Sequence, residues 1–217
     1  MAIDLSVHKN LHIIDHPLIT HKITRMRKKT TKTNEFRVLV KEVAMLEGYE
    51  ALKNLPMVDV EIETPIEKTV CKKIATQSLC FVPILRAGLG MADGMAELVP
   101  GVSFGHIGLY RDEETHNPVE YYCKLPSNIS EKQVILIDPM LATAGSALGA
   151  VELLKKHGVK NIMFICIIAA PEGVDRFCKE YPDIPLYVGA LDRCLNDKAY
   201  ICPGLGDCGD RVFGTVK

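Results

Sequence analysis

The chain has 217 residues and a formal net charge of −1, so it has no overall positive field to hold nucleic acid or an anionic membrane surface. Its longest apolar run, residues 162–170, is much shorter than the roughly 20 residues that a membrane helix needs. We therefore expect one globular domain over residues 1–217, with neither nucleic acid nor a membrane among its partners.

The cysteines and the N-terminus favour a cytoplasmic location. The eight cysteines include no CxxC pair, which argues against a zinc ribbon or a thioredoxin-type site. Several lie within apolar runs, where a free cysteine behaves as a small hydrophobic residue. The first residues lack the basic region and long apolar stretch of a signal peptide.

A basic segment comes first in the chain. It holds Arg25, Arg27, Lys28, Lys29 and Lys32. Three interpretations are open: a solvated helix face, a site for an anionic effector or an interface, and a nucleic-acid patch. No interleaved aromatic residues support the last of these.

A helix and a strand are predicted next. Asn34 is a candidate N-cap for a helix from Glu35 to about Leu55, in which apolar residues recur at helical spacing. Residues 58–63 alternate between apolar and polar, which predicts a strand with one buried face. Thr64 and Pro65 together predict the start of a further helix.

Four apolar runs alternate with helical segments in the rest of the chain. The predicted strands are 79–85, 134–137, 162–168 and 186–191, and the predicted helices are 91–98, 146–157 and 171–181. This order predicts an α/β fold: a Rossmann-like parallel sheet with helices on both faces. Ligands of such sheets bind beyond the carboxyl ends of the strands.

Two further strands, 107–111 and 119–124, flank residues 112–118. We interpret them as a β-hairpin arm; the alternative is a surface hairpin without a role.

The segment after the strand at 134–137 has the features of a phosphate site. Asp138 ends the strand, and small and hydroxyl residues lead into a helix. They are Pro139, Met140, Leu141, Ala142, Thr143, Ala144, Gly145 and Ser146. The unpaired backbone N–H groups of a helix N-terminus bind anions, and small side chains let the anion approach. A carboxylate beside such a cradle suits ribose hydroxyls or metal-bound waters. The alternative is an ordinary strand–turn–helix connection.

Two other segments suit phosphate and base binding. Arg86 follows a buried strand and precedes Gly88 and Gly90; a guanidinium contacts phosphate oxygens in pairs, although a structural ion pair is the alternative. The glycine-rich loop 203–209 can present backbone N–H and C=O groups to a flat base, and otherwise is a flexible surface loop. Tyr200 precedes it and either stacks on the base or belongs to the core.

The segment around Asp138 resembles a motif of a known family. The strand, acid and loop resemble the phosphoribosyl pyrophosphate motif of type I phosphoribosyltransferases, although most members have a second acid where this chain has Pro139. The form Asp-Pro-Met-Leu-Ala-Thr at 138–143 is typical of uracil phosphoribosyltransferases. Segments 86–90, 110–115, 169–173 and 200–211 are also similar to that family, so the resemblance covers nearly the whole chain.

The resemblance implies a reaction, its site and its partners. The reaction joins uracil to phosphoribosyl pyrophosphate and gives UMP and pyrophosphate. The implied catalytic residues are Asp207, Arg86 and Asp138. The implied phosphoribosyl pyrophosphate site is Arg86, Arg111, residues 138–146 and Asp207, and the implied uracil site is Ile201, Gly206, Asp207 and Cys208. Mg²⁺ carried by the pyrophosphate, a GTP effector, a homodimer or higher oligomer, and a small hood from the terminal segments are further expectations.

Two departures from the family pattern are Ala144, where glycine is usual, and Cys208, where alanine is usual. If position 144 needs a left-handed backbone, alanine costs about 1–2 kcal/mol there. Two other functions are weighed against uracil transfer: a phosphoribosyltransferase for another base, and a pyrimidine-sensing RNA-binding regulator. The near-neutral charge argues against the regulator.

Overall fold

The computed structural model describes residues 4–111 and 118–215. Its centre is a nine-stranded sheet in the order β1-β11-β10-β8-β4-β6-β7, with β5 beside β4 and β9 beside β10. Every pairing is parallel except that of β6 with β7. The strands are β1 (Leu11–Ile13), β4 (Leu79–Leu85), β5 (Ser103–Phe104), β6 (His106–Arg111), β7 (Pro118–Lys124), β8 (Gln133–Ile137), β9 (Met140–Leu141), β10 (Asn161–Ala169) and β11 (Leu186–Leu191).

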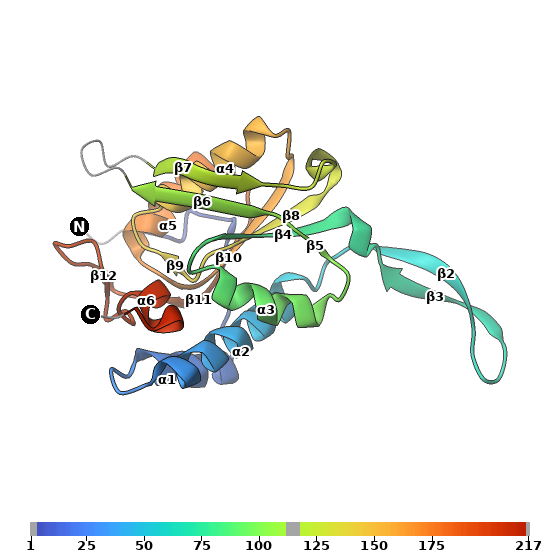
Figure 1. Ribbon diagram of the computed structural model, residues 1–217, viewed down its shortest axis with the longest axis horizontal. Helices are drawn as coiled ribbons and strands as arrows, with labels where there is room; N and C mark the ends of the chain where they lie inside the picture. Colours follow the sequence, from blue (N-terminus) through green and yellow to red (C-terminus); the bar gives the residue numbers. More distant parts are fainter. Residues whose placement is uncertain (1–3, 112–117, 216–217) are drawn as a thin grey trace.

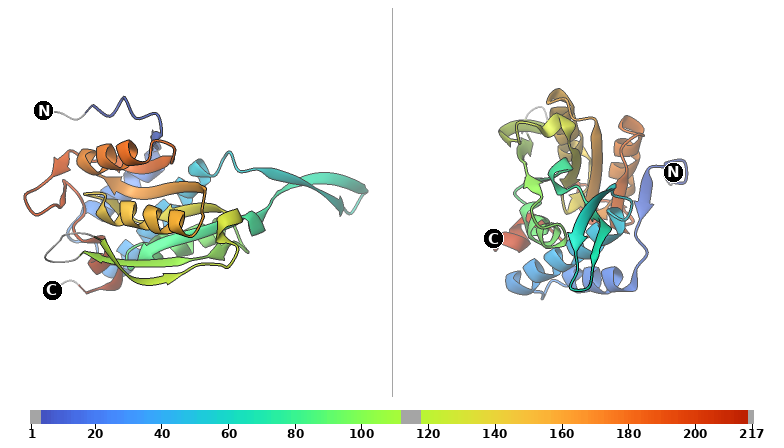
Figure 2. Two further views of the ribbon diagram at one scale, coloured as in Figure 1. Left: turned by 90° about the horizontal axis from the view of Figure 1, so that it is seen from above. Right: turned by 90° about the vertical axis from the view of Figure 1, so that its right-hand side faces the viewer.

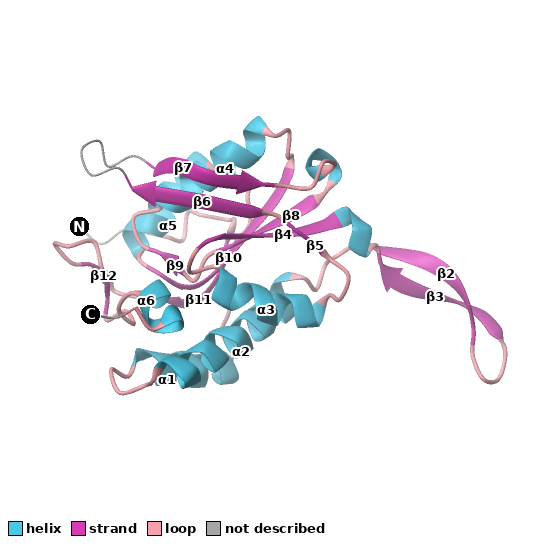
Figure 3. Ribbon diagram, viewed as in Figure 1, coloured by secondary structure: helices cyan, strands magenta, loops and turns pink. Residues whose placement is uncertain are grey.

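Helices cover both faces of this sheet (Figure 3). One layer holds α1 (Pro17–Arg27), α2 (Thr33–Ala51) and α3 (Leu89–Leu98), and the other holds α4 (Gly145–Lys156) and α5 (Pro171–Glu180). In the central strands, Phe81 pairs with Ile135 beneath the first layer, and the next register pair, Val82 with Leu136, faces the second. This two-sided burial explains the continuous apolar runs and confirms the predicted fold class.

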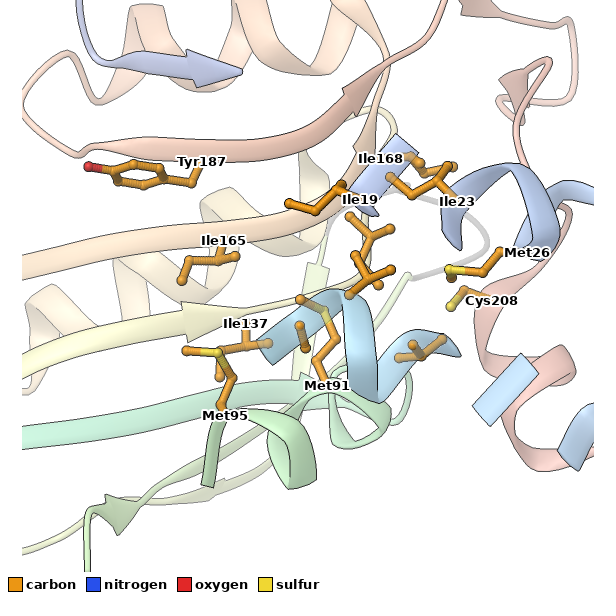
Figure 4. Packing of buried hydrophobic residues seen from close by; sticks show 14 of the residues in the cluster. Ile19, Ile23, Met26, Met91, Met95, Ile137, Ile165, Ile168, Tyr187 and Cys208 are labelled. Atoms are coloured by element: carbon orange, nitrogen blue, oxygen red, sulfur yellow. The ribbon is translucent and has the colours of Figure 1, made fainter. Parts of the chain in front are cut away.

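The core beneath the first layer is built from helix and sheet residues together. Met91 and Met95 of α3 lie over Ile137 and Ile165, and Ile19 of α1 belongs to the same buried cluster (Figure 4). Burial of such side chains stabilises the fold by about 1.5–3 kcal/mol each. Within the described residues, no helix is long and apolar enough to cross a membrane.

The predictions for residues 58–65 were partly wrong. Strand β2 (Met57–Glu63) exists, but it pairs only with β3 (Lys68–Ile74), and neither of its faces is buried in this chain. No helix begins at Pro65: the Thr64 hydroxyl accepts hydrogen bonds from the backbone N–H groups of Ile66 (3.1 Å) and Glu67 (3.0 Å) and closes the turn. The β2–β3 hairpin, here called the arm, projects from the body at the end opposite the C-terminal segment (Figures 1 and 2).

The hairpin predicted at 107–124 is confirmed as a hairpin but not as a projecting arm. Its strands β6 and β7 pair with each other, and β6 also pairs with β4 at the sheet edge. The 3₁₀ turns η1 (Thr76–Ser78) and η2 (Ile129–Glu131) lead into β4 and β8. Residues 112–117, part of the predicted arm segment, lie outside the described residues.

The terminal segments meet over one end of the sheet, as the expected hood requires. The C-terminal part contains β12 (Cys194–Leu195), β13 (Ile201–Cys202) and α6 (Cys208–Phe213). Arg211 of α6 donates hydrogen bonds to the carbonyl oxygens of Leu205 (2.7 Å) and Lys28 (2.8 Å). Helix α2 starts at Thr33 with Lys32 as N-cap, so Asn34 lies in the first turn and was wrongly predicted as the cap.

Candidate active site

The loop from β8 to α4 forms a small cradle. Its hollow of about 90 Å³ is lined by Asp138 and by residues 140–147. Ala144, the N-cap of α4, has a left-handed backbone (φ 66°) and makes no side-chain capping bond, so it leaves the first N–H groups of the helix uncapped, and the first helical residues line the hollow. The structure therefore brings the predicted phosphate residues 138–146 together at a helix N-terminus.

The backbone of Ala144 is left-handed, so the cost expected for alanine at this position applies. Its strain costs about 1–2 kcal/mol relative to a right-handed residue. The Ala144 side chain is buried among the residues under α4, and burying one methyl group returns about 0.8 kcal/mol. Much of the expected cost is offset in this chain.

Two carboxylates approach each other beside the cradle. Burial raises the pKa of Asp138 to about 7; the backbone N–H of Met140 opposes the rise, and the charge of Asp207 adds to it. Asp207 is exposed and also caps α6, because its carboxylate accepts a hydrogen bond from the Asp210 N–H (2.8 Å). Asp138 therefore changes its charge near neutral pH.

The loop after β4 carries Arg86 and a tightly enclosed glycine. The Arg86 side chain is 60% exposed, and among the described residues its carboxylate partner is Asp210, at 3.9 Å. Such a long, exposed contact contributes little to stability, so the guanidinium is available for a ligand. A side chain at Gly88 would lie 2.6 Å from the Ile137 carbonyl oxygen and 2.7 Å from that of Ile84, so only glycine fits between the two strands.

Arg111 ends β6, the strand beside β4. Its backbone thus lies at the same edge of the sheet as the Arg86 loop, whereas its side chain lies outside the described part of the structure.

The predicted uracil residues lie in the segment that joins β13 to α6. Ile201 and Cys208 are buried, and Gly206 has a left-handed backbone (φ 81°). Burial, with the charges of Asp138 and Asp207, raises the pKa of the Cys208 thiol far above its usual range. Cys208 is therefore neutral and belongs to the apolar cluster that also holds Met26 (Figure 4). Tyr200 is 48% exposed, which excludes the core interpretation.

Two residues that were not predicted from the sequence, Asp192 and Arg27, hold this segment in place. Asp192 is buried and accepts hydrogen bonds from the Gly204 N–H (2.8 Å) and from the Arg27 guanidinium (2.7 Å), and Arg27 also donates to the Gly204 carbonyl (2.8 Å). Arg27 is thus a structural residue rather than part of a solvated helix face. Asp192 follows the apolar run of β11 as Asp138 follows that of β8, and this signal could have identified it.

Three segments meet at one end of the sheet. The guanidinium of Arg86 lies near Asp210, and a Cβ placed on Gly209 would contact the Ala87 side chain at 3.7 Å. The charge interaction of Asp207 with Asp138 joins this pair of loops to the cradle. In Figure 1 α6 lies at the end of the sheet that is opposite the arm, where β4 and β8 finish.

A parallel sheet with an acid and a small-residue cradle after one strand, and with an arginine after the neighbouring strand, has the architecture of a type I phosphoribosyltransferase. The adenine phosphoribosyl transferase of Trypanosoma brucei shares this fold at a TM-score of 0.58 and 15% identity, with 95% of this chain and 92% of that chain covered. A protein of Aquifex aeolicus, AQ2163, is closer in structure: its TM-score is 0.90 at 38% identity, over 94% of this chain and 97% of that one.

Sequence comparison gives the particular family. The model of the uracil phosphoribosyltransferase family matches residues 13–215. The uracil phosphoribosyltransferase of Agathobacter rectalis is 59% identical over 94% of this chain and 97% of its own length, and that of Staphylococcus aureus is 57% identical over 94% and 98%. The chain belongs to the uracil phosphoribosyltransferase family.

Proposed function

We propose that this chain transfers the phosphoribosyl group of 5-phosphoribosyl 1-pyrophosphate to uracil, which gives UMP and pyrophosphate. The observation that carries the proposal is the meeting of the cradle, the Arg86 loop and the Asp207 segment at one end of the sheet. Membership of the uracil phosphoribosyltransferase family supports the same pentosyl transfer.

Each part of the site has a role in this proposal. The backbone N–H groups at the start of α4, with the hydroxyls of Thr143 and Ser146, bind the 5-phosphate. Asp138, when ionised, accepts hydrogen bonds from the ribose hydroxyls. Arg86 and Arg111 bind the pyrophosphate oxygens. The backbone of Gly206, Asp207 and Cys208 faces the polar edge of uracil, with Ile201 beside the ring.

The chemistry asked of the protein is mainly electrostatic. Displacement at the anomeric carbon places positive charge on the sugar and negative charge on the leaving pyrophosphate. Arg86 and Arg111 stabilise the leaving group, and the cradle fixes the sugar so that the attacking nitrogen and the anomeric carbon are aligned. Cytosine would be rejected because its amino group reverses one hydrogen-bond polarity and leaves a buried group unpaired.

Mg²⁺ belongs to the proposal as a companion of the substrate. Within residues 4–111 and 118–215, no three His, Cys, Asp or Glu side chains group closely enough to hold a metal ion by themselves. Asp138 and Asp207 offer two carboxylates whose charges interact, and Mg²⁺ is usually held by one or two carboxylates together with substrate phosphates. When bound there, the ion would neutralise charge on the pyrophosphate.

The direct test is formation of UMP from uracil and phosphoribosyl pyrophosphate, with and without Mg²⁺. Hypoxanthine, xanthine and orotate are the competing bases, and turnover of one of these in preference to uracil would contradict the assignment.

Replacing Arg86 with Ala should lower turnover strongly and leave the melting temperature nearly unchanged, because the side chain is exposed. A filter-binding assay with pyrimidine-operon leader RNA tests the regulator alternative.

The proposal includes an anionic effector such as GTP. A cavity of about 410 Å³ lies between the start of α2 and the 203–206 segment. The side chains of Lys29, Lys32 and Arg211 contribute to its lining, and Lys29 and Lys32 are exposed. A triphosphate bound there would contact Gly204 and Gly206 on the opposite wall. It would thereby act on residues 201–208, here called the base segment, which contain the predicted uracil site. Titration of GTP against the rate of UMP formation, in the parent protein and in a Lys29→Ala/Lys32→Ala variant, tests this.

A homodimer and a cytoplasmic location complete the proposal. The arm exposes the apolar side chains of Val58 and Ile62, which share one face of β2, and of Ile66 at its turn, and a second copy of the chain is a partner that would cover them. All eight cysteines are free, which fits a reducing compartment.

A further inference from the structure

Two cysteines lie directly opposite each other in the small two-stranded sheet in which the base segment begins. Strands β12 and β13 are antiparallel, and Cys194 is the register partner of Cys202. Residues that face each other across an antiparallel pair have Cα atoms about 4.5–5.5 Å apart and side chains on the same face. That separation falls within the range of about 4.4–6.8 Å found across disulfides. Both thiols are free and half-buried, so a small reagent can reach them.

The other cysteines have no such arrangement. Burial raises the pKa of Cys80 and Cys166 and raises that of Cys178 to about 11, so these thiols are poor nucleophiles. Cys71 faces Val60 across the arm, and Cys123 faces Ile107 across the sheet edge.

The location of the pair links it to the base segment. Cys202 directly follows Ile201, which is proposed to lie beside the uracil ring. Asp192 lies two residues before Cys194, just ahead of β12, and its carboxylate accepts the 2.8 Å hydrogen bond from the Gly204 N–H. The same strand is fixed to α5, because the Leu195 N–H donates to the Glu172 carboxylate at 2.9 Å. These contacts hold β12 on both sides. A covalent bond between Cys194 and Cys202 would therefore move Ile201 rather than β12.

We propose that Cys194 and Cys202 form a reversible disulfide that weakens uracil binding. The oxidant is a small-molecule disulfide such as oxidised glutathione. One thiol loses its proton and attacks the reagent's disulfide, which releases one reduced thiol and leaves a mixed disulfide on the protein. The second cysteine attacks that mixed disulfide, forms the Cys194–Cys202 bond and releases a second reduced thiol. Two protein thiols are oxidised, and one reagent disulfide is reduced to two thiols.

We expect the disulfide to change the KM for uracil and not the KM for phosphoribosyl pyrophosphate. The Cβ atoms of directly opposed residues in an antiparallel pair lie about 4.5–5.5 Å apart, whereas a disulfide needs about 3.5–4.5 Å, so the bond would draw Cys202 and the adjoining Ile201 toward Cys194. Ile201 is proposed to lie beside the uracil ring, so its displacement should weaken uracil binding. We expect the KM for uracil to rise about tenfold on oxidation, and the KM for phosphoribosyl pyrophosphate to stay nearly constant, because the cradle lies on another part of the chain. This regulatory part depends on the proposed function; formation of the disulfide does not.

The test uses the full chain, oxidised glutathione, and the variants Cys194→Ser and Cys202→Ser, with Cys71→Ser as a matched control. Peptide mass spectrometry should find the Cys194–Cys202 cross-link in the parent protein and in the control, find none in the two serine variants, and find it removed by dithiothreitol. The uracil KM should follow the same pattern.

Three other results would contradict the inference, its regulatory part or the proposed function. Separate glutathione adducts on Cys194 and Cys202, or no modification of either, would overturn the inference. A cross-link that leaves the uracil KM unchanged would overturn its regulatory part. If no UMP forms even in the reduced protein, the proposed function fails, and the cross-link is still decided by mass spectrometry.

Discussion

Asp207 lies near enough to Asp138 for its charge to raise the pKa of the Asp138 carboxyl, although the two residues belong to segments far apart in the chain. Burial is the larger cause of the rise, and together they bring the pKa to about 7. The Asp138 carboxyl, which follows β8, therefore loses its proton near neutral pH and can then accept hydrogen bonds from ribose hydroxyls.

The pH dependence of the reaction follows from this value. The ionised fraction of Asp138 falls below pH 7, so kcat/KM for phosphoribosyl pyrophosphate should drop about tenfold for each further unit of acidity. In Asp207→Asn the midpoint should move to lower pH, because one source of the rise is gone. A pH–rate profile that is flat between pH 5 and 8 in the parent protein would contradict the role of Asp138.

Stability should respond in the opposite direction. A carboxyl whose folded pKa is raised makes the folded state less favourable as the pH rises from the ordinary value of 3.8 to about 7. Asp138→Asn should therefore be more stable than the parent protein at pH 8, with little difference at pH 4, while its activity is low at both. Urea unfolding at the two pH values measures this, and equal differences at both would show that the Asp138 carboxyl is not perturbed.

Gly145 offers a way to separate phosphate binding from folding. A Cβ at this position would have Thr143 Oγ1, at 3.8 Å, as its nearest neighbour, so Gly145→Ala should fold normally, with a gain in helix stability smaller than the about 1 kcal/mol of a helix interior because Gly145 is the first residue of α4. The added methyl group would lie at the cradle and should raise the KM for phosphoribosyl pyrophosphate about tenfold. Gly88→Ala is the matched control. Its Cβ meets backbone atoms below 3 Å, so it should cost about 3 kcal/mol or more in unfolding free energy.

Ala144 tests the left-handed N-cap of α4. Ala144→Gly removes the strain but also a buried methyl group and adds freedom to the unfolded chain, so its unfolding free energy should stay within about 1 kcal/mol of the parent value. Ala144→Val places a β-branched side chain at φ 66° in a buried position and should cost about 2–3 kcal/mol. Similar stability of the valine and glycine variants in thermal unfolding would show that the position is not left-handed in solution.

The sequence predicts the sheet and the cradle because both depend on local patterns. Runs that are apolar on both faces require a covered parallel sheet, and Asp138 with the small residues after it marks the end of one strand. The arm was missed because the alternation of residues 58–63 shows which side chains share a face but not what covers them. Thr64 misled the prediction because a threonine hydroxyl accepts the same two N–H groups in a turn as in a helix cap. The Arg27–Asp192 contact joins positions at opposite ends of the chain, and no local pattern reports it.

The exposed arm predicts that this chain self-associates. Ile66 at its turn is 90% exposed and Ile62 is 38% exposed, and no other described part of the chain covers them. Ile62→Lys should weaken the dimer at least about tenfold, because a charge would have to be buried against an apolar surface.

The arm adds little to the core of one chain, so the secondary structure of this variant should be unchanged. The matched control is Glu61→Lys, whose side chain lies on the opposite face of the same strand. Sedimentation equilibrium over a range of protein concentrations compares the three proteins. A parent protein that is monomeric at every concentration, or equal weakening by both substitutions, would mean that the arm does not bind a second copy through the Ile62 face.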